Sequence, residues 1–251
     1  MSQKLKILIV GGTSTIAEHC ARQWLKQYDC EIILCGRNPE KLQRLCQDLK
    51  VRYPKAELQL KTLDFLDAHA IEQYINTLYQ HSIIDIALIA HGVLPNQEQC
   101  QTDLKLCQQA MQINAISPLL FAETIAKHMI ENNHGKLAVI GSVAGDRGRR
   151  SNYIYGAAKA MIDKYMQGLQ HRLALSHSVV QAILIKPGPT ATAMTAELAH
   201  TAQLAPVEDV AKDIIEAIEV GKPILYTPSK WRLIMLIIRH IPFFLFKKID
   251  I

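Results

Sequence analysis

The sequence has no arrangement of cysteines that is typical of a metal site. Its six cysteines include no C-x-x-C pair and show none of the spacings at which metal ligands occur. We therefore expect no metal ion, and we interpret the cysteines as buried thiols in a reducing compartment.

A large excess of charge is also lacking. The net charge is +5, from 28 Lys and Arg against 23 Asp and Glu. This excess is too small to predict nucleic-acid binding, although it is compatible with an anionic ligand or an anionic membrane surface. The sequence contains no linker, internal repeat or low-complexity segment. With 251 residues, 49% of them hydrophobic, it is predicted to form a single domain over residues 1–251.

The N-terminus lacks the pattern of a signal peptide. Lys4 and Lys6 precede only a short apolar run, which leads directly into a glycine turn. A signal peptide would need a longer apolar segment followed by a cleavage site. We therefore expect a cytoplasmic protein.

Short apolar segments alternate with helical patterns along most of the chain. This alternation predicts an α/β fold, with a doubly wound parallel sheet and helices on both faces. The remaining residues, 228–251, are predicted to form an apolar and basic helical tail. The segments predicted as strands are 5–10, 31–35, 58–63, 83–90, 136–141, 179–185 and 223–227. The segments predicted as helical include 68–80, 98–131 and 207–220.

The first strand ends in a glycine turn that opens a helix, G-G-T-S-T-I-A at 11–17. In this context, backbone N–H groups of the turn and of the helix N-terminus point at a pyrophosphate. Gly11 permits the tight turn, whereas Thr15 replaces a middle glycine and offers a hydroxyl to the phosphate. The alternative is an ordinary glycine-rich turn. The predicted cofactor contacts are Gly11, Thr13, Ser14, Thr15 and Ile16.

The second strand is followed by Gly36-Arg37-Asn38, where no acidic residue is present to hold the ribose 2′-hydroxyl of NAD. The guanidinium of Arg37 suits a 2′-phosphate instead, which favours NADP(H) over NAD(H). The alternative is a solvated arginine that opens the next helix. Asp64 and Phe65, at the end of the third strand, are predicted to flank the adenine.

Tyr155 and Lys159 are spaced to share one face of a helix. A lysine ammonium beside a phenol favours the phenolate, so the spacing predicts a lowered Tyr155 pKa and a phenol that donates a proton to a carbonyl oxygen. Ser142, at the end of the fifth strand, could hold the same oxygen. The alternative is a surface tyrosine and lysine. Tyr153 is excluded as the acid because Ala157, and no lysine, follows four positions later.

Together these motifs resemble the short-chain dehydrogenase/reductase family from Leu5 to about Thr227. The resemblance implies a Rossmann-type fold, NAD(P)-dependent interconversion of a ketone and an alcohol, and assembly into a homo-dimer or tetramer. It implies that Tyr155 is the acid/base, that Lys159 lowers its pKa and holds the nicotinamide ribose, that Ser142 orients the carbonyl and that Asn114 seats a water. Further implied cofactor contacts are Ala90, Gly92, Tyr155, Lys159, Pro187, Gly188, Thr190 and Thr192. The family's usual N-A-G is Ala90-His91-Gly92 here; His91 either lines the nicotinamide pocket or is a variant of the turn.

The segment 141–160, the turn at 11–17 and the tail more narrowly resemble the subgroup of decaprenylphosphoryl-2-keto-pentose reductases. That resemblance implies a keto sugar on a polyprenyl phosphate as substrate. We therefore predict an NADPH-dependent reductase of a lipid-linked or otherwise amphiphilic ketone. The alternatives are a soluble reductase of oxoacyl or small carbonyl compounds, with the tail as an oligomer contact, and a non-catalytic NADP-binding sensor. The full set of asparagine, serine, tyrosine and lysine argues against a sensor.

Two basic features bear on the substrate. Arg147, Arg149 and Arg150 could hold a substrate phosphate, or could form a solvated loop or a subunit contact. The tail has apolar stretches at 233–238 and 241–246, each far shorter than the ~20 residues of a spanning helix. Its basic flanks predict peripheral binding to an anionic membrane surface through 231–248. The alternative is a tail packed over the pocket or in an oligomer interface.

Overall fold

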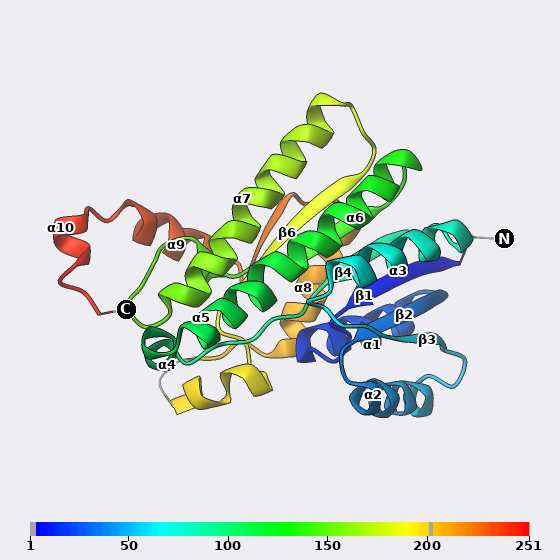
Figure 1. Cartoon of the computed structure of the whole chain (residues 1–251), viewed down its shortest axis with the longest axis horizontal. Coiled ribbons are helices and arrows are strands. Elements are labelled where there is room, and N and C mark those ends of the chain that lie inside the picture. The colour runs from blue at the N-terminus through cyan, green and yellow to red at the C-terminus, as the bar shows by residue number, and fades with distance from the viewer. Residues whose placement is uncertain (1–3, 201–202, 251) are drawn as a thin grey trace.

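A computed structural model describes residues 4–200 and 203–250, with no side-chain detail for 197–200. Seven parallel strands form one sheet in the order β3-β2-β1-β4-β5-β6-β7 (Figure 1). The strands are β1 (Leu5–Val10), β2 (Cys30–Gly36), β3 (Glu57–Thr62), β4 (Ile86–Ile89), β5 (Lys136–Ile140), β6 (Gln181–Pro187) and β7 (Ile224–Thr227). The order reverses between β1 and β4, so the prediction of a doubly wound parallel sheet is confirmed.

The inner strands are largely apolar because helices cover both faces of the sheet, whereas the edge strand β3 alternates polar and apolar residues. The helices are α1 (Thr15–Gln27), α2 (Pro39–Arg52), α3 (Ala68–His81), α4 (Gln97–Thr102), α5 (Leu104–Met111), α6 (Ser117–Glu131), α7 (Tyr153–Leu175), α8 (Val207–Glu219), α9 (Lys230–His240) and α10 (Phe243–Phe246). A π-helical segment, Gln112–Ile116, joins α5 to α6, and short 3₁₀ segments occupy Val143–Gly145 and Ala193–His200. Helices α3, α6 and α7 lie together on the nearer face of the molecule in Figure 1.

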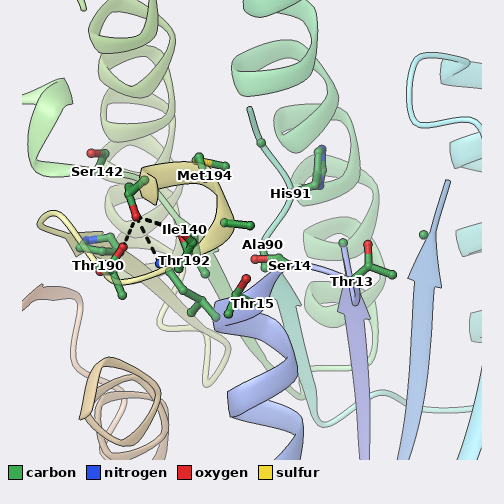
Figure 2. Close-up of a pocket in the computed structure, with 18 of the residues that line it drawn as sticks. Thr13, Ser14, Thr15, Ala90, His91, Ile140, Ser142, Thr190, Thr192 and Met194 are labelled. Carbon is green, nitrogen blue, oxygen red and sulfur yellow. Dashed lines mark hydrogen bonds between the residues drawn. The ribbon is translucent and has the colours of Figure 1, made fainter. Parts of the chain in front are cut away.

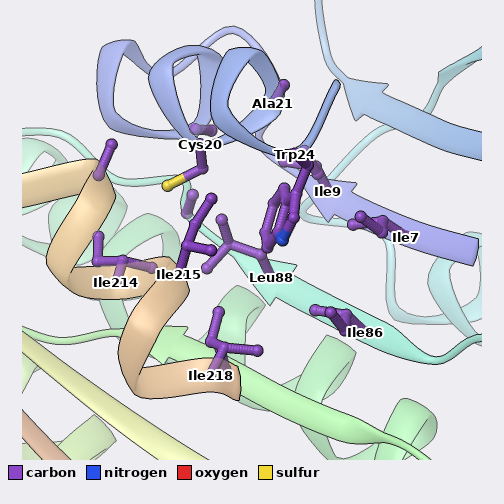
Figure 3. Packing of buried hydrophobic residues seen from close by; sticks show 14 of the residues in the cluster. Ile7, Ile9, Cys20, Ala21, Trp24, Ile86, Leu88, Ile214, Ile215 and Ile218 are labelled. Atoms are coloured by element: carbon purple, nitrogen blue, oxygen red, sulfur yellow. The ribbon is translucent and has the colours of Figure 1, made fainter. Parts of the chain in front are cut away.

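Two hydrophobic cores, one on each face of the sheet, hold the strand ends in place. On one face, Trp24 of α1 and Ile214 and Ile218 of α8 pack against Ile7 and Leu88 of the sheet (Figure 3). On the other face, side chains of α3, α6 and α7 pack against the alternate residues of the same strands. This two-sided burial makes the sheet a rigid platform, at whose edge the loops carry the functional groups.

The region 98–131, which was predicted as one helical region, is divided into several segments. Asp103 ends α4 and begins α5, because its carboxylate accepts hydrogen bonds from the backbone N–H groups of Lys105 and Leu106. The helix then widens into the π-helical turn that contains Asn114. Such π-helical turns are frequent at functional sites.

Two of the predicted strands also differ from the observed strands by two or more residues at an end. The segment at 179–185 was predicted as a strand, whereas β6 runs from Gln181 to Pro187. The side chain of Val179 is 62% exposed, so it adds no core contact that would extend the strand in that direction. The predicted strand 83–90 is likewise shortened to Ile86–Ile89.

Five of the six cysteines are buried and Cys107 is half-buried. Burial raises the pKa of Cys30 to about 11 and that of Cys35 to about 12.

Helices α9 and α10 form the C-terminal tail, at the end of the molecule away from α2 and α3 (Figure 1). Helix α9 contacts β7, and its Met235 is buried.

Within residues 4–200 and 203–250, no helix is both long enough and apolar enough to cross a bilayer. In the same described residues, no group of three or more His, Cys, Asp or Glu side chains could hold a metal ion. The assignment of 1–251 to one domain stays a prediction.

Candidate active site

A cavity of about 350 Å³ lies at the carboxyl edge of the sheet. Its walls come from the turn after β1 and from the segments that follow β2, β4, β5 and β6, together with Tyr155 and Lys159 of α7. Ligands of open α/β sheets bind at this edge, where the strand order reverses. In Figure 2, Ser14 and Thr15 stand at the start of α1, between Thr13 and the threonines of the loop after β6.

The turn after β1 has a backbone that only glycine accommodates. Gly11 has φ +86°, and a Cβ at this position would lie 2.6 Å from the backbone nitrogen of His91. Ser14 precedes the first residue of α1, and its side chain makes no capping hydrogen bond. The N–H groups of the first turn of α1 and the hydroxyls of Ser14 and Thr15 therefore line the cavity as donors for an anionic group.

The wall after β2 is basic. Arg37 and Lys41 both line the cavity, and no Asp or Glu is found among the described residues that do so. The side chain of Asn38 accepts from the backbone N–H of Lys41 at 2.8 Å, which begins α2 at this point and fixes both basic residues on the same side. Sequence reasoning missed Lys41, although its place in the first turn of the helix that opens after Arg37 could have indicated it. The residues present thus fit a dinucleotide that carries an additional phosphate.

Ser142 and Tyr155 meet in the cavity although they come from different elements. Ser142 follows β5 and begins the 3₁₀ segment Val143–Gly145, where its Oγ accepts from the backbone N–H of Ala144 at 3.1 Å. Tyr155 lies in the first turn of α7, and hydrogen bonding to the Ser142 hydroxyl lowers the pKa of its phenol. The two hydroxyl groups can therefore bind one carbonyl oxygen together.

The structure differs from the expectation that Lys159 lowers the pKa of Tyr155. Burial raises the pKa of the Tyr155 phenol, and the hydrogen bond with Ser142 lowers it only in part. The Lys159 ammonium lies 5.8 Å from the centre of the Tyr155 ring and donates to the carbonyl oxygen of Ile140 at 2.9 Å. Burial also lowers the pKa of Lys159 to about 8. Desolvation, which residue spacing does not reveal, therefore outweighs the ammonium charge, and the phenol is protonated at neutral pH.

Asn114 lies next to the site and is not part of the cavity wall. Its fully buried side chain accepts from the backbone N–H of Val93 at 2.8 Å and donates to the carbonyl oxygen of Ala110 at 3.0 Å. A Cβ on Gly92 would lie 2.9 Å from the Asn114 Oδ1 and 3.7 Å from the Lys159 Nζ. Asn114 therefore fixes the loop after β4 close to Lys159; the water that the resemblance implies stays a prediction.

The loop after β6 forms the wall opposite the glycine turn. Thr190 is buried and its hydroxyl donates to the carbonyl oxygen of Gly188 at 3.0 Å. Thr195, which sequence reasoning missed, forms hydrogen bonds with Thr192 and with the carbonyl oxygen of Thr190. A Cβ on Gly188 would lie only 2.0 Å from the indole nitrogen of Trp231, so α9 of the tail packs directly on this loop.

Most of the predicted cofactor residues line this one cavity, and Asp64 is the exception. Its carboxylate accepts from the backbone N–H of Leu66 at 2.9 Å and forms a local turn. Phe65 is buried against His91 and Phe121, at ring-centre distances of 4.7 and 5.0 Å. His91 lines the cavity, and its Nε2 lies 2.9 Å from the Ser117 hydroxyl. Burial lowers the pKa of His91 to about 3, so the imidazole is neutral.

The lining residues that sequence reasoning missed include Asn38, Lys41, Ile140, Gly141, Ala193, Met194 and Thr195.

The three arginines of the loop between Ser142 and Tyr155 are not among the residues that line the cavity. Arg147 donates to backbone carbonyl oxygens at the end of α9, and Arg150 forms an ion pair with Asp250 at 2.6 Å. Arg149 is partly buried, which lowers its pKa. Two of the three arginines are thus bound to the tail, and a phosphate site on this loop stays a prediction.

The match to a known family agrees with this geometry. Residues 5–203 match the family model described as short chain dehydrogenase. The chain belongs to the short-chain dehydrogenase family. It is 27% identical over 243 residues to an uncharacterized oxidoreductase of Mycobacterium tuberculosis, with 96% of each chain covered. It is 26% identical over 243 residues to an uncharacterized oxidoreductase of Streptomyces coelicolor, with 97% of this chain and 95% of the relative covered.

Solved structures share the fold of this short-chain dehydrogenase at low sequence identity. A short-chain dehydrogenase from Sphingobium yanoikuyae in complex with NADPH superposes with a TM-score of 0.80 at 18% identity, covering 95% of this chain and 97% of that one. A short-chain dehydrogenase from Burkholderia cenocepacia in complex with NADP gives a TM-score of 0.78 at 16% identity, covering 93% and 92%. The family match and the oxidoreductase relatives identify the chain as an NAD(P)-dependent oxidoreductase.

Proposed function

We propose that this short-chain dehydrogenase uses NADPH to reduce a ketone to a secondary alcohol, on an amphiphilic, keto-sugar-like substrate. The observation that carries the proposal is the convergence of Ser142, Tyr155 and Lys159 on the same cavity as the glycine turn and the basic residues Arg37 and Lys41. One end of the cavity suits a phosphorylated dinucleotide, and the other suits a carbonyl oxygen.

The residues around the cavity divide the work of the reduction. The bound nicotinamide would supply the hydride that adds to the carbonyl carbon. Ser142 and Tyr155 would hold the carbonyl oxygen through their hydroxyl groups, and the neutral Tyr155 phenol would transfer its proton to that oxygen as negative charge develops. The Lys159 ammonium, in the adjacent turn of α7, would stabilise the phenolate that remains. The carbonyl oxygen of Ile140 keeps this ammonium oriented at 2.9 Å.

NADP(H) is the proposed cofactor because the wall after β2 carries two cations and no acid among its described residues. Arg37 is exposed and can turn its planar guanidinium onto a 2′-phosphate, and Lys41 adds a second positive charge from the first turn of α2. The bound NADPH or NADP of the two structural neighbours is consistent with this preference.

The C-terminal tail supports an amphiphilic substrate and peripheral binding to a membrane. Its outer face exposes Leu233, Ile237, Phe243 and Phe244 at 58–74% of their surface. Five exposed cations accompany them, namely Lys230, Arg232, Arg239, Lys247 and Lys248, against the single acid Asp250 in 230–250. An apolar face with a basic margin is complementary to an anionic bilayer surface. We therefore propose peripheral association through 231–248; assembly into a dimer or tetramer stays a prediction from the family.

The amphiphilic preference can be tested with matched ketones. Ethyl acetoacetate and dodecyl acetoacetate share one ketone, as do a keto-pentose phosphate and its farnesyl ester. We expect ketone-dependent NADPH oxidation, with the secondary alcohol as product and a higher kcat/KM for the long-chain member of each pair. Equal or lower kcat/KM for the long-chain members would favour the soluble small-carbonyl reductase, and no oxidation with any of the four would favour the NADP-binding sensor.

The membrane proposal predicts co-flotation with vesicles that contain phosphatidylglycerol, and weaker flotation with pure phosphatidylcholine vesicles or at high salt. Phe243→Asp together with Phe244→Asp should lower partitioning more than tenfold, because a buried phenyl ring contributes about 1.5–3 kcal/mol. Val51→Asp is the matched control, since Val51 is 81% exposed on α2, away from the tail. Unchanged flotation of the double variant would contradict the proposal.

A further inference from the structure

The loop between Ser142 and α7 is fixed from the inside by Asp146. The Asp146 carboxylate is paired with the buried ammonium of Lys186 and accepts from the Tyr226 hydroxyl at 2.9 Å. Lys186 also donates to Asp163 at 2.6 Å. Asp163 lies one turn after Lys159 on α7, and Lys186 directly precedes Pro187. The buried Lys186 ammonium therefore joins three segments: the loop between Ser142 and α7 (the serine loop), helix α7 and the loop after β6.

The next residue, Arg147, fixes the same loop from the outside. Its Nη1 donates to the carbonyl oxygens of Ile238 at 2.6 Å, Arg239 at 3.1 Å and Ile241 at 2.6 Å. Two of these belong to the last turn of α9, where carbonyl groups lack partners within the helix and the helix dipole favours a cation. The guanidinium also stacks on the ring of Phe246 in α10, with 3.8 Å from Cζ to the ring centre.

The other end of α9 touches the opposite wall of the site. Trp231 packs on the backbone of Gly188 so closely that any Cβ there would collide with the indole. Between these two contacts, Met235 is buried and anchors the middle of the helix. The tail thus spans from the loop after β6, next to the cavity, to the loop that carries Ser142, and Arg147 supplies the contact at the second end.

We propose that Arg147 is a positioning residue for the reaction: by binding the C-terminal end of α9 and Phe246, it holds the serine loop in the geometry in which Ser142 meets Tyr155. The inference rests on the proposed ketone reduction for its effect on turnover. Its effect on the order of the loop is independent of that function. Arg147 is therefore not a ligand of a substrate phosphate, and the tail is a structural part of the active site.

The test is a double-mutant cycle on the full chain with Arg147→Ala, Phe246→Ala and the two combined. Hydrogen exchange of the amides in 143–152 and in the tail is measured first, since it requires no substrate. Turnover of ethyl acetoacetate with NADPH is measured second, because this soluble probe does not depend on a membrane surface. Arg150→Ala and Phe244→Ala are the matched controls, because the Arg150 ion pair is exposed and Phe244 is 62% exposed.

We expect faster exchange in both segments for Arg147→Ala, a fall in kcat of about ten- to a hundredfold from misplacement of Ser142, and NADPH affinity within about twofold of wild type. Phe246→Ala should act in the same direction and add less than its full effect to the double variant, because both side chains serve one contact. Arg147→Lys should recover part of kcat. Unchanged exchange at 143–152 in Arg147→Ala would overturn the proposal, as would faster exchange with unchanged kcat. If wild type reduces no ketone, the exchange data alone decide whether Arg147 orders the loop, and the failure is assigned to the proposed function.

Discussion

Replacement of Tyr155 by phenylalanine is expected to lower kcat for ketone reduction by about 10²–10⁴-fold, the usual contribution of a positioned general acid. The half-buried Tyr155 lines the cavity together with Ser142, and desolvation raises the pKa of its phenol, so the wild-type side chain holds a proton ready for the carbonyl oxygen. Phenylalanine keeps the ring and its packing and removes only the donor. NADPH binding, followed by cofactor fluorescence, should therefore change little.

Tyr153→Phe provides the matched control for this experiment. Tyr153 lies two residues earlier on α7, is 41% exposed and does not line the cavity. The same loss of one hydroxyl there should leave kcat within about twofold of wild type, as is usual for surface substitutions. Comparable turnover in Tyr155→Phe and wild type would remove Tyr155 as the proton donor, and equal losses in both variants would point to a general effect on α7.

Reversal of the charge at Arg37 is expected to change the cofactor preference. Arg37→Asp should weaken NADPH binding by about 1.5–3 kcal/mol, or roughly 10- to 150-fold, which is typical for the loss of hydrogen bonds to a charged group. NADH lacks the 2′-phosphate, and the new carboxylate can accept from its ribose hydroxyl, so NADH binding should be retained or strengthened. The measurement is Kd for each cofactor by fluorescence titration.

Arg44→Asp is the control for the change of charge alone. Arg44 is exposed on the same helix, α2, and does not line the cavity. Because exposed charges more than about 10 Å apart are largely screened at 0.1 M salt, this variant should hardly alter either Kd. If Arg37→Asp weakened NADPH and NADH equally, Arg37 would not recognise the 2′-phosphate, and Lys41 would be the remaining candidate for that role.

The alternation of apolar and helical segments was sufficient to predict a parallel sheet and the succession of its strands along the chain, whereas the order of the strands within the sheet came from the structure. The reason is local, because a strand buried on both faces must be apolar along its whole length and the glycine turn after it must open a helix. Boundaries were less certain where capping decided them. Asp103 divides the region 98–131 through two hydrogen bonds of its carboxylate, and hydrophobic periodicity does not register such bonds.

For the site, the sequence by itself determined which residues could carry the chemistry: the spacing of Tyr155 and Lys159, Ser142 at a strand end, and a cation in place of an acid after β2. Only the tertiary structure decided how these groups behave. Burial raises the Tyr155 pKa although a lysine is near, and Lys159 is bound to the carbonyl oxygen of Ile140. Arg147, one of the three arginines that suggested a phosphate site, donates to the carbonyl oxygen of Ile238 in α9, 91 residues away in the chain. Desolvation and long-range partners depend on which segments pack together, and this information is spread over the whole chain, so no local motif contains it.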